Sequence, residues 1–205
     1  PVQDPRTADT AIFYSISSTQ QGLRGISFGN LLLKRVIEDL QRDLPRLSVF
    51  ATLSPVPGFR AWLDRALAER RAVLPAGETA KLAAAVAHPE PATALADILA
   101  RPDWASDERL AGALREPMER LCARYLLLEK SGAQPLDPVA HFHLSNGAHV
   151  SSIFWLADTS ARGMRQSYGV MASYRYALSE VGKNHEQFQQ NGRVAAARRV
   201  LKLLD

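Results

Sequence analysis

The first third of the chain alternates between strand-like and helix-like hydrophobic patterns. Residues 11–18 are rich in β-branched and aromatic side chains, and residues 47–54 alternate strictly between two faces. Both patterns are typical of β-strands. Between and after them, apolar residues recur at helical spacing. The first set is Leu33, Val36, Ile37 and Leu40, and the second is Phe59, Trp62, Leu63, Ala66 and Leu67. The order strand, helix, strand, helix predicts an α/β arrangement with parallel strands.

The middle of the chain is predicted to be helical. Short helices are expected over residues 82–87, 92–99 and 107–114, followed by a longer one. That longer helix carries an apolar stripe formed by Met118, Leu121, Cys122, Tyr125 and Leu126.

The last third returns to strand character and ends in a predicted helical tail. Residues 137–155 are expected to form two strand halves joined by the turn pair Asn146-Gly147. The tail has apolar residues at helical spacing, namely Val194, Ala197, Leu201 and Leu204.

Composition places the chain among globular proteins and argues against nucleic acid as a partner. Of the 205 residues, 46% are hydrophobic and 22% are charged, so one substantial core is expected. The net charge of +4 comes from 25 basic and 21 acidic residues that are scattered along the chain. A basic patch with interleaved aromatic side chains, which nucleic-acid binding favours, is missing.

The single cysteine and the hydropathy pattern exclude further classes. Cys122 is the only cysteine, so neither an intramolecular disulfide nor a Cys-rich zinc site can form. Its apolar stripe favours a role in the core over one in catalysis. No apolar run approaches the ~18 residues of a membrane span, and residues 1–20 do not have a signal-peptide pattern. We therefore expect a cytoplasmic protein, and the richness in Ala, Arg and Leu is typical of a bacterial one.

A glycine-bearing loop lies between the first predicted strand and the first predicted helix. Gly25 and Gly29 let the backbone of residues 24–30 approach a ligand, and the following helix offers free N–H groups. The segment lacks both the Lys-Ser/Thr pair of a Walker loop and the spacing of a dinucleotide fingerprint. It is either a phosphate-binding cradle or a plain turn.

Ser54 is predicted to be the last residue of the second strand. The sequence Pro55-Val56-Pro57-Gly58 follows, and proline cannot donate to a strand ladder, so we expect the strand to stop there. Strand ends in open α/β sheets are where ligands bind. No G-x-S-x-G elbow surrounds Ser54, which argues against an α/β-hydrolase nucleophile. Ser54 is either a site residue or a helix-capping serine.

Three histidines lie in the segment HFHLSNGAH. If this segment is a strand, His141 and His143 point to the same face, and His149 lies beyond the turn. Two such histidines suit a metal site, but further ligands of fitting type are not evident nearby. Acid–base chemistry by a neutral histidine is the better functional interpretation. A buried, hydrogen-bonded histidine is the structural alternative.

Four segments, in this order, resemble the malonyl-CoA decarboxylase family. They are AIFYSISSTQQGLRGISFGNLLLKRVIEDLQ, FATLSPVPGFRAWL, DPVAHFHLSNGA and ADTSARGMRQSYGVMASYRY. The resemblance extends from about Thr10 to the C-terminus and is weakest between Leu74 and Asp107. The TLSPVPGF and FHLSNGA blocks are the most specific.

The resemblance implies an α/β (α+β) catalytic domain similar to the GNAT acetyltransferase fold. We expect residues 1–205 to be most of that domain, with a helical insertion at about 74–130 and a helical C-terminal tail. The family also has an N-terminal helical domain and first catalytic strands that these residues do not contain. The start at Pro1 fits a later part of a longer polypeptide. Family members assemble through the helical domain, which implies a homo-oligomer.

The resemblance also assigns site residues. Ser54 matches the catalytic serine, a proton acceptor, and His143 matches the catalytic histidine, a proton donor. Tyr176 and Asn146 fall in neighbouring segments as candidates for supporting roles. The loop expected to hold the coenzyme A part of malonyl-CoA consists of Arg24, Gly25, Ile26, Ser27, Phe28, Gly29 and Asn30.

The implied reaction converts malonyl-CoA to acetyl-CoA and carbon dioxide. It needs no metal and no cofactor beyond the coenzyme A of the substrate, because the thioester is itself the electron sink. Three alternatives stay open. They are an acyl-CoA-dependent acyltransferase, a non-catalytic malonyl-CoA sensor on the same fold, and a metal hydrolase built on His141 and His143.

Overall fold

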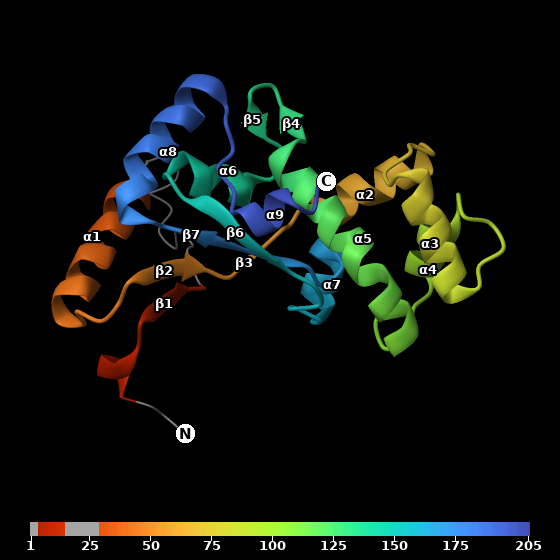
Figure 1. Cartoon of the computed structure of the whole chain (residues 1–205), viewed down its shortest axis with the longest axis horizontal. Helices are drawn as coiled ribbons and strands as arrows, with labels where there is room; N and C mark the ends of the chain where they lie inside the picture. The colour runs from red at the N-terminus through yellow and green to blue at the C-terminus, as the bar shows by residue number, and fades with distance from the viewer. Residues whose placement is uncertain (1–3, 15–28) are drawn as a thin grey trace.

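A computed structural model of the chain describes residues 4–14 and 29–205 (Figure 1). The strands of its main sheet are β1 (Thr10–Phe13), β2 (Val49–Thr52), β3 (Ser54–Pro55), β6 (His149–Phe154) and β7 (Met171–Arg175). A separate small hairpin consists of β4 (Lys130–Ser131) and β5 (Gln134–Pro135). The helices are the 3-10 turn η1 (Pro5–Thr7), α1 (Gly29–Asp43), α2 (Phe59–Ala68), α3 (Ala76–Val86), α4 (Ala94–Ala100), α5 (Glu108–Leu127), α6 (Pro138–Ser145), α7 (Ala161–Ser167), α8 (Leu178–Asn191) and α9 (Arg198–Leu201).

The main sheet is mixed. β1 runs parallel to β2, as the strand–helix–strand pattern at the start of the chain predicts. The later strand β7 is antiparallel to β2 and β3 along one edge and to β6 along the other. The parallel prediction is therefore confirmed for β1 and β2, and the rest of the sheet is built from antiparallel pairs.

The predicted second strand is interrupted rather than ended at Ser54. Leu53 separates β2 from β3, and Ser54 is the first residue of β3. Pro55 belongs to β3 and lies opposite Met171 of β7, so the strand ends one residue later than predicted, within the Pro55–Gly58 segment expected to stop it. Proline is tolerated here because it lies at the end of a strand, where one ladder hydrogen bond fewer costs little.

The segment 137–155 is half helix and half strand. Its first half forms α6, with Asp137 as N-cap and Pro138 in the first turn, and only its second half forms a strand, β6. The prediction of a strand over residues 138–145 is therefore wrong. An aspartate followed by proline is a helix-start signal, and Ala140, His143 and Leu144 are buried at helical spacing.

The C-terminal tail is helical in α8 and α9, as predicted, but residues 192–197 between these helices are not. Val150 in β6 and Ala196 form a parallel bridge, in which Ala197 N donates to Val150 O at 2.9 Å. Only the short α9 follows. The hydrogen bonds that the edge of β6 offers explain why the tail extends along it.

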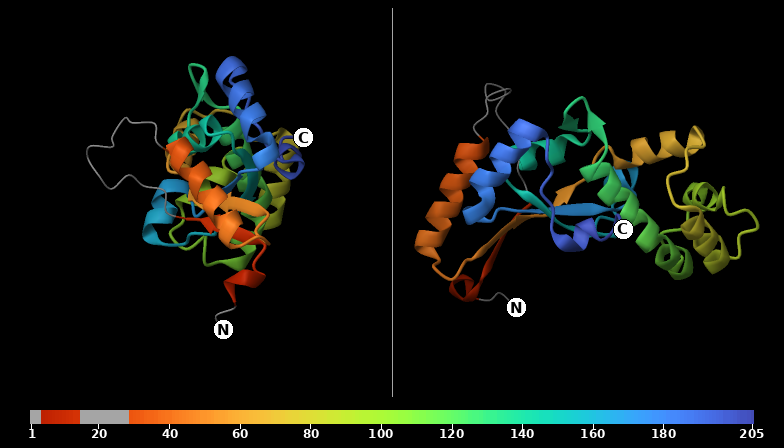
Figure 2. Two further views of the ribbon diagram at one scale, coloured as in Figure 1. Left: turned by 90° about the vertical axis from the view of Figure 1, so that its left-hand side faces the viewer. Right: turned by 45° about the horizontal axis from the view of Figure 1, so that its top comes forward.

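Helices α2 to α5 gather at one end of the sheet, on the right in Figure 1, and α1 and α8 lie at the other end (Figures 1 and 2). The range 74–130 contains α3, α4 and α5. The two helices predicted between Asp107 and Leu126 are one 20-residue helix, α5. Cys122 is fully buried in α5, which confirms its place in the core. Among the described residues, none of the helices combines the length and apolarity of a membrane span.

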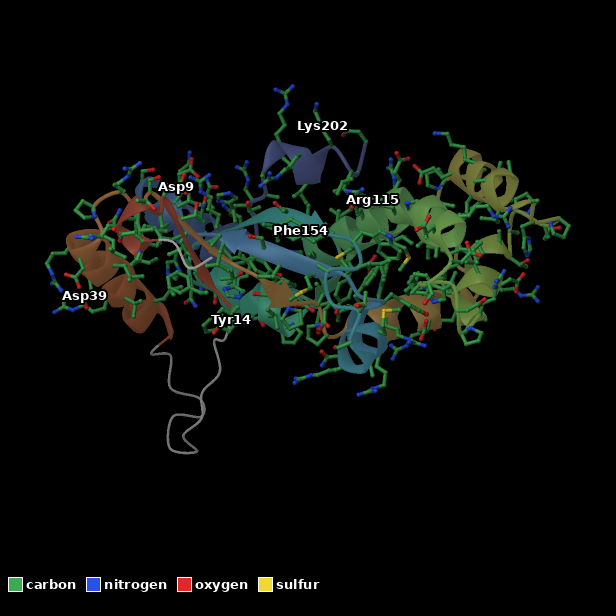
Figure 3. All side chains as sticks on the ribbon, turned by 90° about the horizontal axis from the view of Figure 1, so that it is seen from below. Asp9, Tyr14, Asp39, Arg115, Phe154 and Lys202 are labelled. Atoms are coloured by element: carbon green, nitrogen blue, oxygen red, sulfur yellow. The ribbon has the colours of Figure 1, made fainter. Side chains whose placement is uncertain are left out.

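One hydrophobic core extends from the sheet into the helical end. It includes Phe50 of β2, Phe59 of α2 and Leu121 of α5, all fully buried. Helices α6 and α9 cover opposite faces of the sheet, as the view from below shows, with Lys202 marking the α9 side (Figure 3). The α6 face carries the site described next.

Candidate active site

The break between β2 and β3 places two hydroxyl side chains on the α6 side of the sheet. Thr52 and Ser54 are both buried, and the Ser54 hydroxyl donates to Thr52 Oγ1 at 2.9 Å. Thr52 Oγ1 also accepts the backbone N–H of Tyr174 in β7 at 3.2 Å. Thr52 therefore ties the Ser54 side chain to the central strand of the sheet.

Helix α6 brings His143 to the same point. Asp137 Oδ1 caps the helix by accepting Ala140 N–H at 2.8 Å. Six residues after that cap, His143 Nε2 lies 3.2 Å from Ser54 Oγ, although the two residues are 89 positions apart in sequence. The structure thus brings Ser54 and His143 into hydrogen-bonding contact.

Two tyrosines of the β7 segment hold the other sides of the imidazole. The Tyr174 ring stacks on the His143 ring, with centroids 4.4 Å apart and planes inclined by 23°. Tyr176, directly after β7, places its hydroxyl 2.8 Å from His143 Nδ1. Both ring nitrogens therefore have a hydroxyl partner, which restrains the orientation of the ring.

Burial decides the protonation state of the site. The His143 side chain is 2% exposed, and this burial lowers its pKa to about 3. Burial also raises the pKa of the Tyr176 hydroxyl above its usual range. Both groups are consequently neutral at physiological pH. The site thus holds no permanent charge, and protons can pass among the side chains of Ser54, His143 and Tyr176.

Ser54 and His143 line a cavity of about 500 Å³. One part of its wall is apolar and comes from the end of β1, from β3 and from α6. Tyr14, at the end of β1, lies beside α6 (Figure 3). Another part is polar and belongs to α7 and the loop before it. The described residues that line the cavity are Phe13, Tyr14, Leu53, Ser54, Pro55, Pro138, Val139, Phe142, His143, Asp158, Arg162, Gln166 and Met171.

The remaining predicted residues have different outcomes. Asn146 ends α6 and is buried, and its amide nitrogen finds no hydrogen-bond partner among the described residues. Arg24, Gly25, Ile26, Ser27 and Phe28 of the predicted coenzyme A loop lie outside the described residues. Gly29 and Asn30 are the first residues of α1.

The predicted strand geometry of the histidines is wrong. In a helix, residues two apart point about 200° away from each other. His141 accordingly packs against Phe188 of α8, and His149 lies in β6. Within residues 4–14 and 29–205, no cluster of three or more His, Cys, Asp or Glu side chains is placed to hold a metal ion.

Sequence reasoning missed three residues that build the site. Thr52 shares a strand face with Ser54, and Tyr174 precedes Tyr176 by two residues, so period-two alternation could have indicated both. Asp137 was recognisable as a helix cap before proline. Its carboxyl group is fully buried, and burial raises its pKa to about 6 against the opposing effect of nearby backbone N–H groups.

Comparisons with known proteins show the family of the chain. The family model for the malonyl-CoA decarboxylase C-terminal domain matches residues 1–205. The mitochondrial malonyl-CoA decarboxylase of Rattus norvegicus is 41% identical over 200 residues, which cover 95% of this chain and 40% of the relative. That of Anser anser anser is 39% identical over 207 residues, covering 98% and 41%. The chain thus spans about two fifths of the length of these relatives.

Two solved structures share the fold. The malonyl-CoA decarboxylase of Agrobacterium vitis superposes with a TM-score of 0.84 at 43% identity and covers 98% of this chain and 46% of its own. That of Rhodopseudomonas palustris has a TM-score of 0.80 at 43% identity, covering 97% and 43%.

Proposed function

Because the chain belongs to the malonyl-CoA decarboxylase family, we propose that it carries the site at which malonyl-CoA becomes acetyl-CoA and carbon dioxide. The observation that carries this proposal is the contact between Ser54 and His143 at the wall of a cavity. A serine and a neutral histidine can supply the proton that cofactor-free decarboxylation must deliver to carbon.

The proposed reaction has two steps. The bond between the α-carbon and the carboxylate breaks, carbon dioxide leaves, and the electron pair moves into the thioester to form an enolate. His143 Nε2 then gives its proton to the α-carbon, which yields acetyl-CoA. Solvent returns one proton to the site after each turnover, so the overall reaction consumes one proton.

The hydrogen bonds around His143 support this direction of transfer. The Ser54 hydroxyl donates to Thr52, so its oxygen is free to accept from a protonated Nε2. The Tyr176 hydroxyl then donates to Nδ1. In this tautomer Ser54 is the proton acceptor that orients His143, and Tyr176 offsets the charge left on the imidazole as the proton departs. The apolar wall strengthens these interactions by excluding water.

Further features of the site belong to the same proposal. The mixed sheet with helices on both faces supports a GNAT-like catalytic fold. The loop 24–30 is proposed to hold the coenzyme A moiety, with no other cofactor and no metal. A cytoplasmic homo-oligomer without nucleic-acid or membrane partners remains our proposal for the whole protein.

A decarboxylation assay without an acyl acceptor tests the function. Incubation of the protein with malonyl-CoA should produce acetyl-CoA and carbon dioxide in equal amounts. Free coenzyme A and an acylated amine, formed only when an amine is added, would indicate an acyltransferase. Malonyl-CoA that is bound and recovered intact would indicate a sensor. Either of these two results would contradict the proposal.

Replacing Ser54 with alanine is expected to lower kcat about 10- to 100-fold. The change removes the hydroxyl that accepts from His143, while Thr52 and the sheet keep their backbone contacts. The predicted loss is that of one buried hydrogen bond that orients the proton donor in the transition state. Steady-state kinetics check it, with near-UV circular dichroism to verify the fold. Unchanged turnover would remove Ser54 from the mechanism.

The rate should lack the pH inflection of an ordinary histidine. Because burial lowers the pKa of His143 to about 3, the imidazole is neutral at every pH above this value, and kcat should show no inflection near 6.5 between pH 5 and 8. The pH profile is also measured for the variant Asp137→Asn, because the Asp137 carboxyl has its pKa raised to about 6 and titrates in the same pH range. An inflection near 6.5 that persists in this variant would contradict a neutral His143.

A further inference from the structure

The polar wall of the cavity belongs to a different element of the fold from Ser54 and His143. It consists of Asp158, in the loop after β6, and of Arg162 and Gln166 in α7. Apart from His143, Arg162 is the one basic side chain among the described residues that line the cavity. Most of the other described lining residues are apolar, and Asp158 is the one acidic residue among them.

Close packing between α7 and its preceding loop fixes the position of this wall. Ser160 caps α7 by accepting Gly163 N–H at 3.1 Å, and Asp158 Oδ1 accepts Ser160 N–H at 3.1 Å. A Cβ atom added at Gly163 would lie 2.3 Å from the Asp158 carbonyl oxygen, so only glycine permits this approach. Asp158 N–H also donates to Gly169 O at 3.1 Å. Loop and helix therefore present Arg162 from a defined backbone position.

Among the described residues, the Arg162 side chain takes part in no ion pair or hydrogen bond, and the residue is exposed, so a ligand can reach its guanidinium. Asp158, in the same wall, instead accepts Ser160 N–H. An arginine offers a planar fork of N–H groups that matches a carboxylate at two points. A carboxylate that enters this cavity would meet Arg162 as its one strongly cationic partner among the described residues.

We propose that Arg162 binds the free carboxylate of the malonyl group. This inference rests on the proposed function and specifies how the site distinguishes its substrate. Malonyl-CoA carries a carboxylate and acetyl-CoA does not, so the contact would favour substrate over product. The contact would also hold the carboxylate away from Ser54 and His143. This orientation of the malonyl group determines which bond breaks and leaves the α-carbon accessible to the proton on His143.

The contact acts mainly on binding. An ion pair with the carboxylate stabilises the bound substrate, and the charge leaves the carboxylate as carbon dioxide forms. Removing Arg162 should therefore raise the KM for malonyl-CoA more than it lowers kcat.

The test uses two stable thioethers of coenzyme A, which differ only in the carboxylate. S-(2-carboxyethyl)-CoA has the carboxylate at the same chain position as malonyl-CoA, S-ethyl-CoA lacks it, and neither can be decarboxylated. Their dissociation constants are measured by calorimetry on the full chain with Arg162→Gln, Arg162→Lys or no change. The matched control is Arg165→Gln, because Arg165 lies in α7 but does not line the cavity.

The unchanged protein should bind the carboxyethyl ligand more tightly than the ethyl ligand. Arg162→Gln should weaken carboxyethyl binding about 10- to 100-fold and ethyl binding less than twofold. Arg162→Lys should restore part of the affinity, because lysine supplies charge without the fork. Arg165→Gln should change neither constant.

Three results would overturn the proposal. An equal loss for both ligands would mean that Arg162 contacts the coenzyme A moiety, and no loss for either would mean that it contacts neither part. Equal affinity of the unchanged protein for both ligands would mean that no carboxylate site exists. These measurements require no turnover, so they stand apart from the decarboxylation assay, whose failure would instead reject the proposed function.

Discussion

Replacing His143 with asparagine is expected to lower kcat for malonyl-CoA decarboxylation about 10²- to 10⁴-fold, the usual contribution of a positioned general acid. The variant loses Nε2, which lies 3.2 Å from Ser54 Oγ, and with it the proton that we assign to the α-carbon. It also breaks the contact with the Tyr176 hydroxyl. Coenzyme A binding should persist, because the large CoA moiety extends beyond the reacting groups.

The control for this variant is the same change two residues earlier. His141 belongs to α6 as well but packs against Phe188, away from Ser54. We expect His141→Asn to keep kcat within about twofold of the unchanged protein, in line with ordinary substitutions outside a site. Circular dichroism and the binding of S-ethyl-CoA verify that both variants are folded. The mechanism fails if His143→Asn retains full turnover, or if both variants lose the same amount.

Replacing Gly147 with alanine is expected to lower the free energy of unfolding by about 2 to 4 kcal/mol. Gly147 follows α6 with φ +80°, a conformation that L side chains rarely adopt. An added Cβ would lie 2.2 Å from the carbonyl oxygen of Val181 in α8, and backbone cannot yield as a side-chain end can. The substitution therefore forces apart two helices that pack directly behind the site.

Alanine variants of two other glycines separate steric clash from backbone strain as the cause of the lower free energy of unfolding. Gly132 also has a positive φ, +63°, but no described atom would lie within 4 Å of its added Cβ, so Gly132→Ala measures conformational strain alone. Gly112 lies inside α5 with equally open space, and Gly112→Ala should stabilise the protein by about 0.5 to 1 kcal/mol. Urea unfolding of the three variants gives the values. A Gly147→Ala loss no larger than that of Gly132→Ala would refute the steric argument.

Local periodicity was sufficient for elements whose two faces differ strongly. The spacing of Phe59, Trp62 and Leu63 predicts α2, and all three side chains are buried. The alternation in residues 47–54 predicts one strand, although not the break at Leu53 that divides it into β2 and β3. Residues 138–145 form α6, although their aromatic and histidine side chains are typical of a strand. There the cap formed by Asp137 and Pro138 was the stronger physical signal.

The helix predicted around Val194 and Ala197 is missing for a different reason. Val194 and Ala197 have helical spacing, yet their segment extends along the edge of β6. The strand edge offers backbone hydrogen bonds that no local pattern reveals, and tertiary context overrides a weak helical preference.

The amino-acid sequence by itself determined the family resemblance, the candidates Ser54, His143 and Tyr176, and the helices and strands with strong periodicity. Only the tertiary structure decided that these three side chains touch, because residues 89 positions apart meet through the packing of α6 on the sheet. Burial in that packing, rather than residue type, makes the His143 imidazole neutral by lowering its pKa to about 3. Folding likewise brings Arg162 to the same cavity, because α7 packs directly against β3, although the two elements are far apart in sequence.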